Sequence, residues 1–193
     1  MHLPLSETAR SALLIVDMQE YFFQKEERRR LLPQALENMN HLIEFFDAQS
    51  WPVVHVVSRY LADGSDWDLK MKAAGVPELI VGTPEADILP QISVHPHHLT
   101  VRKTRYSAFF KTGLADELSY RGVERVVVVG AYTHYCVNAT IFDAFAYDFV
   151  PCLIVDAVIS HLPDEAEMMI DRMRRNGYHV FSTQEFIDVE RPE

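Results

Sequence analysis

The residue with the clearest chemical potential is Cys136, one of two cysteines in the 193 residues. It follows the apolar run RVVVVG (125–130) and begins a helical pattern, whereas Cys152 lies inside an apolar strand pattern. Unpaired backbone N–H groups and the helix dipole favour a thiolate in the first turn of a helix. We therefore predict that Cys136 is a nucleophile and that the backbone N–H groups of Tyr132 and Cys136 form an oxyanion hole.

Two ionisable side chains are expected beside this thiol. Asp17 ends the apolar run SALLIVD (11–17), and Lys103 ends LTVRK (99–103). Open parallel sheets bind ligands beyond the carboxyl ends of their strands, so the three side chains are expected at one edge. Asp17 would take the thiol proton and return it later, and Lys103 would supply positive charge. Each residue also has a simpler interpretation when it is considered alone. Cys136 could be a core thiol, Asp17 a turn former and Lys103 a solvated charge.

The elements that position these residues alternate along the chain between strand and helix patterns. Strands separated by helices pair in parallel through right-handed crossovers, which predicts an α/β fold with helices on both faces of the sheet. Pro33 is expected in the first turn of one helix, Thr112 and Thr133 as N-caps of two others, and Asp164 at the start of a fourth. The predicted strands are 11–17, 52–58, 99–103, 125–130, 151–157 and 178–182, and the predicted helices are 33–50, 112–121, 136–148 and 164–176.

The segment 59–98 has no clear pattern and is rich in Gly, Pro, Asp and His. Such a long connection is more often functional than idle, which predicts a lid or a pocket wall. It contains HPHH (95–98), but adjacent histidines do not share a helical face and no nearby cysteine or carboxylate completes a ligand set. No metal site is therefore predicted there.

Composition limits the class of protein. Hydrophobic residues make up 48% and charged residues 24%, as in a globular chain, and 1–193 is expected to form a single domain. The net charge of −10 argues against nucleic acid or an anionic membrane as partner, and no apolar run is long enough to span a membrane. Two apparently unpaired cysteines and the lack of a signal-peptide pattern favour the cytoplasm. The chain shows no nucleotide fingerprint, so we expect a small-molecule substrate and no cofactor.

Three motifs occur in an order that is similar to that of a known family. They are ALLIVDMQEYF, RKTRYSAFFKTGLADEL and VVVVGAYTHYCVNATIFDAFAYDF, and with them residues 10–185 resemble the isochorismatase-like cysteine hydrolases. The resemblance implies a three-layer α/β/α, Rossmann-like fold around a six-stranded parallel sheet of order 3-2-1-4-5-6. It also implies a catalytic triad of Asp17, Lys103 and Cys136, a cis peptide bond between Ala131 and Tyr132, and a homo-oligomer (dimer or tetramer).

The same resemblance suggests residues that bind the substrate. Gln19 and Phe22 are expected near the pocket, and Arg59 is expected to clamp a substrate carboxylate. The full set of predicted substrate-binding residues is Gln19, Phe22, Arg59, Tyr60, Trp67, Tyr106 and Tyr132.

Two branches of the family imply different chemistry. GAYTHYC and KTRYSAF resemble the isochorismatases, which cleave a vinyl ether and typically lack the cysteine. Because this chain keeps Cys136, we predict an amidohydrolase that cleaves a C–N bond of a small amide, carbamoyl or ureido compound through a thioester. The metal site of nicotinamidases, Asp-x-His after the second strand, has no counterpart in SRYLADGSDWDLK, so no catalytic metal is expected. The alternatives are vinyl-ether hydrolysis with Asp17 as acid, a non-catalytic binder, and a thiol redox protein.

Overall fold

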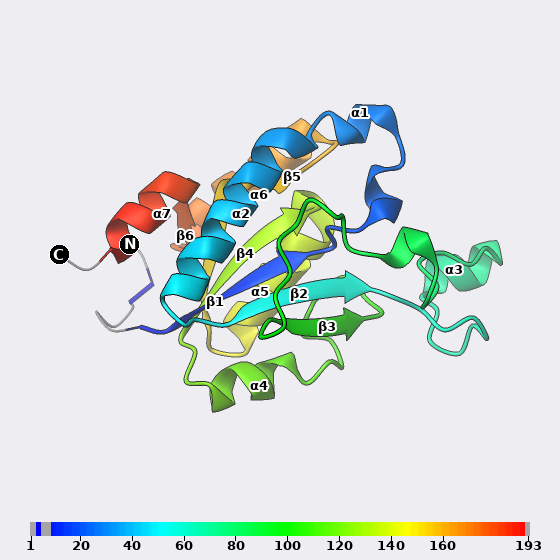
Figure 1. The fold of residues 1–193 in the computed structure, drawn as a ribbon, viewed down its shortest axis with the longest axis horizontal. Coiled ribbons are helices and arrows are strands. Elements are labelled where there is room, and N and C mark those ends of the chain that lie inside the picture. The colour runs from blue at the N-terminus through cyan, green and yellow to red at the C-terminus, as the bar shows by residue number, and fades with distance from the viewer. Residues whose placement is uncertain (1–2, 5–8, 192–193) are drawn as a thin grey trace.

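The computed structural model describes residues 3–4 and 9–191, and over these residues six parallel strands form one sheet (Figure 1). The strand order is β3-β2-β1-β4-β5-β6, which confirms the predicted arrangement, and helices cover both faces. The strands are β1 (Ser11–Val16), β2 (Val53–Ser58), β3 (Leu99–Lys103), β4 (Arg125–Ala131), β5 (Val150–Ile159) and β6 (His179–Phe181).

The central strands β1 and β4 are buried along their whole length, as expected of continuous apolar runs in a parallel sheet. Their pairing ends with Val16 opposite Gly130, and the pairing of β2 with β3 ends with Ser58 opposite Lys103. Gly130 has a φ of +106°, and a Cβ atom there would lie 2.2 Å from the carbonyl oxygen of Val16. Only glycine therefore allows β4 to lie this close to β1 where the two strands end.

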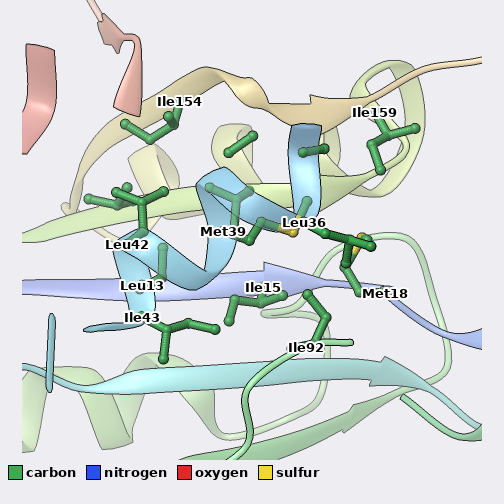
Figure 2. Packing of buried hydrophobic residues seen from close by; sticks show 14 of the residues in the cluster. Leu13, Ile15, Met18, Leu36, Met39, Leu42, Ile43, Ile92, Ile154 and Ile159 are labelled. Atoms are coloured by element: carbon green, nitrogen blue, oxygen red, sulfur yellow. The ribbon is translucent and has the colours of Figure 1, made fainter. Parts of the chain in front are cut away.

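Helices α2 (Leu32–Ala48) and α7 (Thr183–Glu190) pack against one face of the sheet. In Figure 2, Leu36, Met39, Leu42 and Ile43 of α2 lie over Leu13 and Ile15 of β1, with further buried apolar side chains around them. The opposite face is covered by α4 (Leu114–Tyr120), α5 (Asn138–Ala146) and α6 (Pro163–Arg175). The remaining short helices are η1 (Glu20–Phe23), α1 (Glu26–Arg29), α3 (Leu69–Ala74), η2 (Pro84–Ala86) and η3 (Thr133–Val137).

Two of the predicted N-caps differ from the structure. Thr133 is the first residue of the π-helical turn η3, and its hydroxyl donates to the carbonyl of Ile159 at 3.2 Å instead of capping a helix. α4 begins at Leu114, after Gly113 in the left-handed region, although the hydroxyl of Thr112 does accept a bond from the Leu114 N–H at 3.3 Å. A tertiary partner thus replaces the local cap at Thr133, whereas at α4 Gly113 holds the cap position one residue after Thr112.

Two further helix starts carry local sequence signals. Asp164 lies in the first turn of α6, one residue after Pro163. The predicted helices do not include α7, although Ser182 and Glu185 form a capping box at its start. Among the residues that the structure describes, no helix has the length and apolar content needed to cross a membrane.

Candidate active site

Asp17 lies immediately after β1, where its backbone adopts a φ of +53° and its N–H donates to the carbonyl of Val56 at 2.9 Å. The side chain is fully buried. One carboxylate oxygen, Oδ1, accepts the N–H of Ser58 at 3.1 Å and its hydroxyl at 2.9 Å. The end of β2 thus fixes the carboxylate that follows the end of β1.

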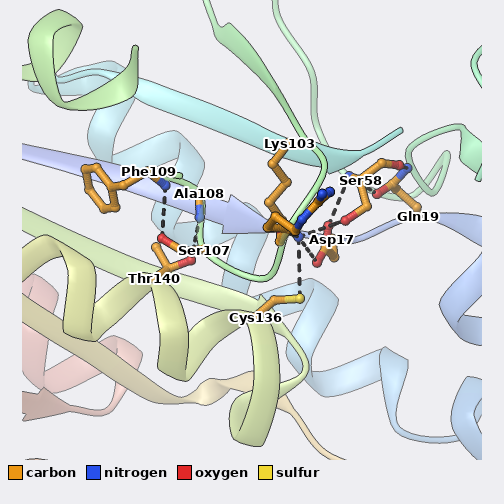
Figure 3. Close-up of polar contacts among 10 residues, drawn as sticks. Asp17, Gln19, Ser58, Lys103, Ser107, Ala108, Phe109, Cys136 and Thr140 are labelled. Carbon is orange, nitrogen blue, oxygen red and sulfur yellow. Dashed lines mark hydrogen bonds and ion pairs between the residues drawn. The ribbon is translucent and has the colours of Figure 1, made fainter. Parts of the chain in front are cut away.

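Lys103, the last residue of β3, lies at the centre of the site (Figure 3). Its ammonium contacts Asp17 Oδ2 at 2.8 Å and donates to Ser58 Oγ at 2.7 Å and to the carbonyl of Arg105 at 3.1 Å. On the other side it lies 3.4 Å from Cys136 Sγ. The lysine side chain is 1% exposed, so water screens none of these contacts. One ammonium therefore bridges the carboxylate and the sulfur, and the structure brings the three predicted residues together.

Cys136 is the fourth residue of η3, and its thiol is buried. The expectation that its helical position favours a thiolate is wrong for the resting site, because burial raises the pKa of the Cys136 thiol far above its ordinary value. The charge of Asp17 raises it further, and Lys103 only partly offsets both effects. Burial by itself would lower the pKa of Lys103, but Asp17 and Cys136 raise it. In the resting site burial therefore favours the neutral thiol over the thiolate, with the Lys103 ammonium beside it.

The side chain of Gln19 forms hydrogen bonds with the backbone around this site. Its amide nitrogen donates to the carbonyls of Ser58 at 3.0 Å and Ala86 at 2.8 Å, and its amide oxygen accepts the N–H of Ser58 at 2.8 Å. These bonds tie the end of β2 to the short helix η2. The residue supports the position of Asp17 through Ser58.

The Ala131–Tyr132 peptide bond is cis, as the family resemblance implies. The hydroxyl of Tyr132 donates to the carbonyl of Phe22. The Tyr132 ring packs edge-on against Phe22, with centroids 5.8 Å apart. This residue joins the loop before Cys136 to the turn after β1.

A cavity of about 300 Å³ opens onto the thiol. Phe22, Tyr60 and Tyr106 line it, as predicted, together with Ser58 and Cys136. The remaining described lining residues are Tyr21, Asp68, Lys70, Met71, Ala74, Val76, Glu78 and Leu79. Many of them belong to the segment 59–98, which therefore forms a wall of the cavity, as its length predicts.

Four predicted substrate-binding residues, Gln19, Arg59, Trp67 and Tyr132, are missing from the described lining of this cavity. Arg59 donates from Nε to the carbonyl of Ala86 at 3.1 Å and has a guanidinium nitrogen 3.8 Å from Asp87, so its charge is already engaged. Trp67 donates to the carbonyl of Leu61 at 2.8 Å and packs against a small apolar cluster. Both side chains support the segment instead of facing the thiol.

Sequence reasoning missed Asp68 and Lys70, which line the cavity from α3 and its N-cap. A local signal for this helix exists: Asp68 caps it by accepting the Met71 N–H at 2.8 Å, and Gly75 ends it in the left-handed region. Lys70 donates to the hydroxyl of Tyr106 at 2.8 Å.

The metal-ligating side chains that the described part of the chain brings together lie elsewhere. Asp47, His97 and His98 place ligand atoms within 4.8 Å of one another, and no triad residue belongs to this group. The expectation that no carboxylate completes the HPHH run is therefore wrong, because Asp47 comes from α2, far away in the sequence.

The parallel sheet with a thiol, an ammonium and a carboxylate at its carboxyl edge is the arrangement of an α/β cysteine hydrolase. The chain belongs to the isochorismatase family, since the family model for the isochorismatase domain matches residues 11–185. Members of this family are hydrolases, and they include amidases as well as isochorismatases.

Individual relatives agree with this assignment. An isochorismatase family protein from Desulfovibrio vulgaris has a TM-score of 0.84 and 30% identity, covering 94% of this chain and 98% of that one. Enterobactin synthase component B of Escherichia coli K12 is 26% identical over 187 residues, which are 96% of this chain. The chain spans 65% of that relative's length. Ureidoacrylate amidohydrolase RutB of Agrobacterium fabrum is 35% identical over 86 residues, 45% of this chain and 38% of that protein.

Proposed function

We propose that this protein is a cysteine amidohydrolase that cleaves the C–N bond of a small amide, carbamoyl or ureido compound through a thioester. The observation that carries the proposal is the ammonium of Lys103, which lies 2.8 Å from Asp17 Oδ2 and 3.4 Å from Sγ of Cys136, the thiol that lines the cavity. The similarity to an enzyme named ureidoacrylate amidohydrolase supports this class of substrate.

The first half-reaction forms the thioester. As Cys136 Sγ attacks the substrate carbonyl carbon, the thiol proton moves to the carboxylate of Asp17. The negative charge passes from Asp17 to the sulfur and then to the carbonyl oxygen, and Lys103 stays close to the first two positions. The proton on Asp17 then moves to the leaving nitrogen, the C–N bond breaks, and ammonia or an amine departs.

The second half-reaction consumes water. Asp17 takes a proton from the attacking water, whose oxygen bonds to the thioester carbon. When the C–S bond breaks, that proton returns to the sulfur, the acid is released, and the resting thiol is restored. The backbone N–H groups of Tyr132 and Cys136 would stabilise the oxyanion in both halves.

We further propose that the substrate carries a carboxylate, which Lys70 binds at the cavity wall. Two acidic residues share this wall, and each has a partner: Asp68 accepts the N–H of Met71, and Glu78 accepts the hydroxyl of Tyr21. The rings of Tyr106 and Tyr135 stack with centroids 5.5 Å apart, and the Lys70 ammonium lies beside them, 5.6 Å from each centroid. It thus takes over the role that the sequence suggested for Arg59.

The test is a turnover screen with nicotinamide, ureido acids, N-carbamoyl amino acids, biuret, maleamate and isochorismate. We expect release of ammonia or an amine from at least one of the amide, carbamoyl or ureido compounds. Rapid quenching and intact mass measurement should then show an acyl or carbamoyl adduct on Cys136. The Cys136→Ala variant should lose the amidase activity and the adduct.

Cys152→Ala is the matched control, because Cys152 is the other free thiol and is buried in β5, outside the described lining of the cavity. It should keep both activity and adduct. If isochorismate is turned over instead, and Cys136→Ala retains that turnover, the site is a vinyl-ether hydrolase with Asp17 as acid. If no compound reacts and no adduct forms, a binding or thiol redox role replaces the proposal.

The proposed partners are this small-molecule substrate and further copies of the same chain. Light scattering of the purified protein measures the molar mass, and a dimer or tetramer is the expected result. A mass equal to one chain would contradict the homo-oligomer.

A further inference from the structure

Three histidines and one aspartate converge at the edge of the sheet opposite to the catalytic residues. The histidines belong to the HPHH run just before β3, and Asp47 lies in the last turn of α2. Five residues along β3 separate His98 from Lys103, or about 16 Å at the rise of a strand. The group is therefore distinct from the hydrolase site.

The side chains point their ligand atoms at one place. His97 Nε2 lies 2.8 Å and His98 Nε2 3.1 Å from the Oδ1 atom of Asp47. His95 Nε2 lies 3.7 Å from Oδ2 of the same carboxylate. The His95 and His97 rings are parallel to within 2°, and each meets the His98 ring edge-on. Three imidazole nitrogens thus surround a single carboxylate.

These distances fit a small divalent ion. Zinc binds nitrogen and oxygen at about 2.1 Å, which puts the ligand atoms of a tetrahedral site about 3.4 Å apart. Asp47 Oδ1 lies about 0.6 Å closer than that to His97 and about 0.3 Å closer to His98, and the ligand atoms of these three residues all lie within 4.8 Å of one another. His95 Nε2 lies 3.7 Å from the other oxygen of the carboxylate. A small movement of the His97 and His98 rings would make room for the ion, and His95 would turn toward it to complete the set.

One side of this site is buried in the protein, and the other side is open to solvent. The His98 side chain is 1% exposed, while that of His97 is 66% exposed, so an ion can enter from solvent. Behind His98, its Nδ1 atom faces Nε2 of His55 at 3.0 Å, and the Nδ1 atom of His55 is buried without a hydrogen-bond partner. A hydrogen-bond acceptor on the second ring nitrogen orients a metal-binding histidine, and the His55 ring is placed to be that acceptor for His98.

The metal-free hydrogen bonds show what the ion would replace. His98 Nδ1 accepts the backbone N–H of His95 at 3.2 Å, so Nε2 carries the ring proton and donates to Asp47. On metal binding this proton would move to Nδ1, where His55 Nε2 accepts it and the His95 amide gives up its bond.

We propose that Asp47, His95, His97 and His98 form a binding site for a divalent transition metal, Zn²⁺ being the best fit. Three imidazole nitrogens and one carboxylate oxygen are a donor set for zinc or its neighbours, whereas Mg²⁺ and Ca²⁺ prefer oxygen ligands. The ion would tie the end of α2 to the loop before β3. Because the ion would lie far from Cys136, its role is to stabilise the fold. The proposed metal site does not depend on the proposed amidase activity.

The test is titration of the tag-free, metal-stripped protein with Zn²⁺, followed by calorimetry and by thermal unfolding. We expect saturable binding of one ion per chain and a rise of the unfolding temperature, with no comparable response to Mg²⁺ or Ca²⁺. His97→Ala and Asp47→Asn should each weaken Zn²⁺ binding at least about tenfold. Since His97 is largely exposed, its variant should fold normally.

His41→Ala is the matched control, because His41 is an exposed histidine on the same helix. It should bind Zn²⁺ like the unchanged protein. The proposal is overturned if the unchanged protein shows no saturable binding, or if His97→Ala and Asp47→Asn bind as tightly as it does. Binding that survives both variants and disappears in Cys136→Ala would place the ion at the catalytic thiol and also overturn it.

Discussion

Replacing Lys103 by methionine removes the ammonium and keeps most of the side-chain volume. Lys103 lies 2.8 Å from Asp17 Oδ2 and 3.4 Å from Cys136 Sγ. With an effective dielectric constant of about 20, the Coulomb attraction is about 6 kcal/mol to the carboxylate and about 5 kcal/mol to a thiolate. The difference is only about 1 kcal/mol. Lys103 therefore hardly biases the proton transfer, and its main effect is to hold a negative charge inside the protein at either position.

This reasoning predicts a specific pattern of stability. Lys103→Met leaves the buried Asp17 without its cation, and Asp17→Asn leaves the ammonium without its anion, so each should lower the free energy of unfolding by about 3–5 kcal/mol. The double variant contains neither charge. It should be more stable than the sum of the two losses implies, with a coupling free energy of at least about 3 kcal/mol.

Activity should follow a different pattern. Because Lys103 hardly biases the proton transfer itself, kcat should fall in Lys103→Met chiefly because burial without a cation favours the protonated form of Asp17, which then cannot act as the base. Loss of general-base catalysis corresponds to a fall in kcat of about 10²–10⁴-fold. The double variant should be as inactive as the single ones, because it lacks the base as well. Recovery of stability without recovery of activity separates the structural effect of the ion pair from its catalytic effect.

The assay is urea unfolding of the four proteins at neutral pH, with amidase turnover measured on the same samples. Lys72→Met, on the exposed side of α3, is the control and should change the free energy of unfolding by less than about 0.5 kcal/mol. If the losses in the two single variants simply add in the double variant, the two charges are not coupled and the reasoning is refuted.

Three further predictions concern single residues. Burial, with the charges of neighbouring histidines, lowers the pKa of His55 from 6.5 to about 4. The neutral His55 ring therefore contributes fully to the free energy of unfolding above pH 6.5, and this contribution is lost as the pH falls towards 4. Urea unfolding at about pH 7.5 and about pH 4.5 should show a loss of about 3 kcal/mol that is absent in His55→Gln, and an equal loss in both proteins would contradict this. Gly130→Ala should lower the free energy of unfolding by about 3 kcal/mol or more, because its Cβ would strike the carbonyl of Val16, whereas Gly82→Ala, with open space around it, should cost about 1 kcal/mol. Lys70→Met should raise KM about tenfold for substrates with a carboxylate and leave kcat unchanged, and an equal rise for uncharged amides would argue against an ionic contact.

Much of the fold and the site follows from local patterns in the sequence. Apolar β-branched runs predict the strands, and Asp17 and Lys103 lie at the ends of two of them, with Cys136 shortly after a third. Because parallel strands place their carboxyl ends at the same edge, the alternation of strands and helices suffices to bring these three residues together. The family motifs then add the strand order, which no local pattern contains.

The charge state of the site depended on tertiary structure. A helical position favours a thiolate at Cys136, but burial by surrounding elements outweighs that effect, and its size is set by atoms distant in the sequence. Tertiary structure also decides whether Arg59 or Lys70 lines the cavity. Both are cations in one long segment, and only the path of that segment decides which of them faces the cavity.

What the sequence by itself determined is therefore the set of strands, the positions of Asp17 and Lys103 at their ends, and the class of chemistry that they share with Cys136. What only the tertiary structure decided is which distant groups meet, as Asp47 meets the HPHH run some 50 residues later. The physical reason is that strand and helix patterns arise from neighbouring residues. Burial, charge pairing and metal geometry instead arise from atoms that the folded chain brings close in space.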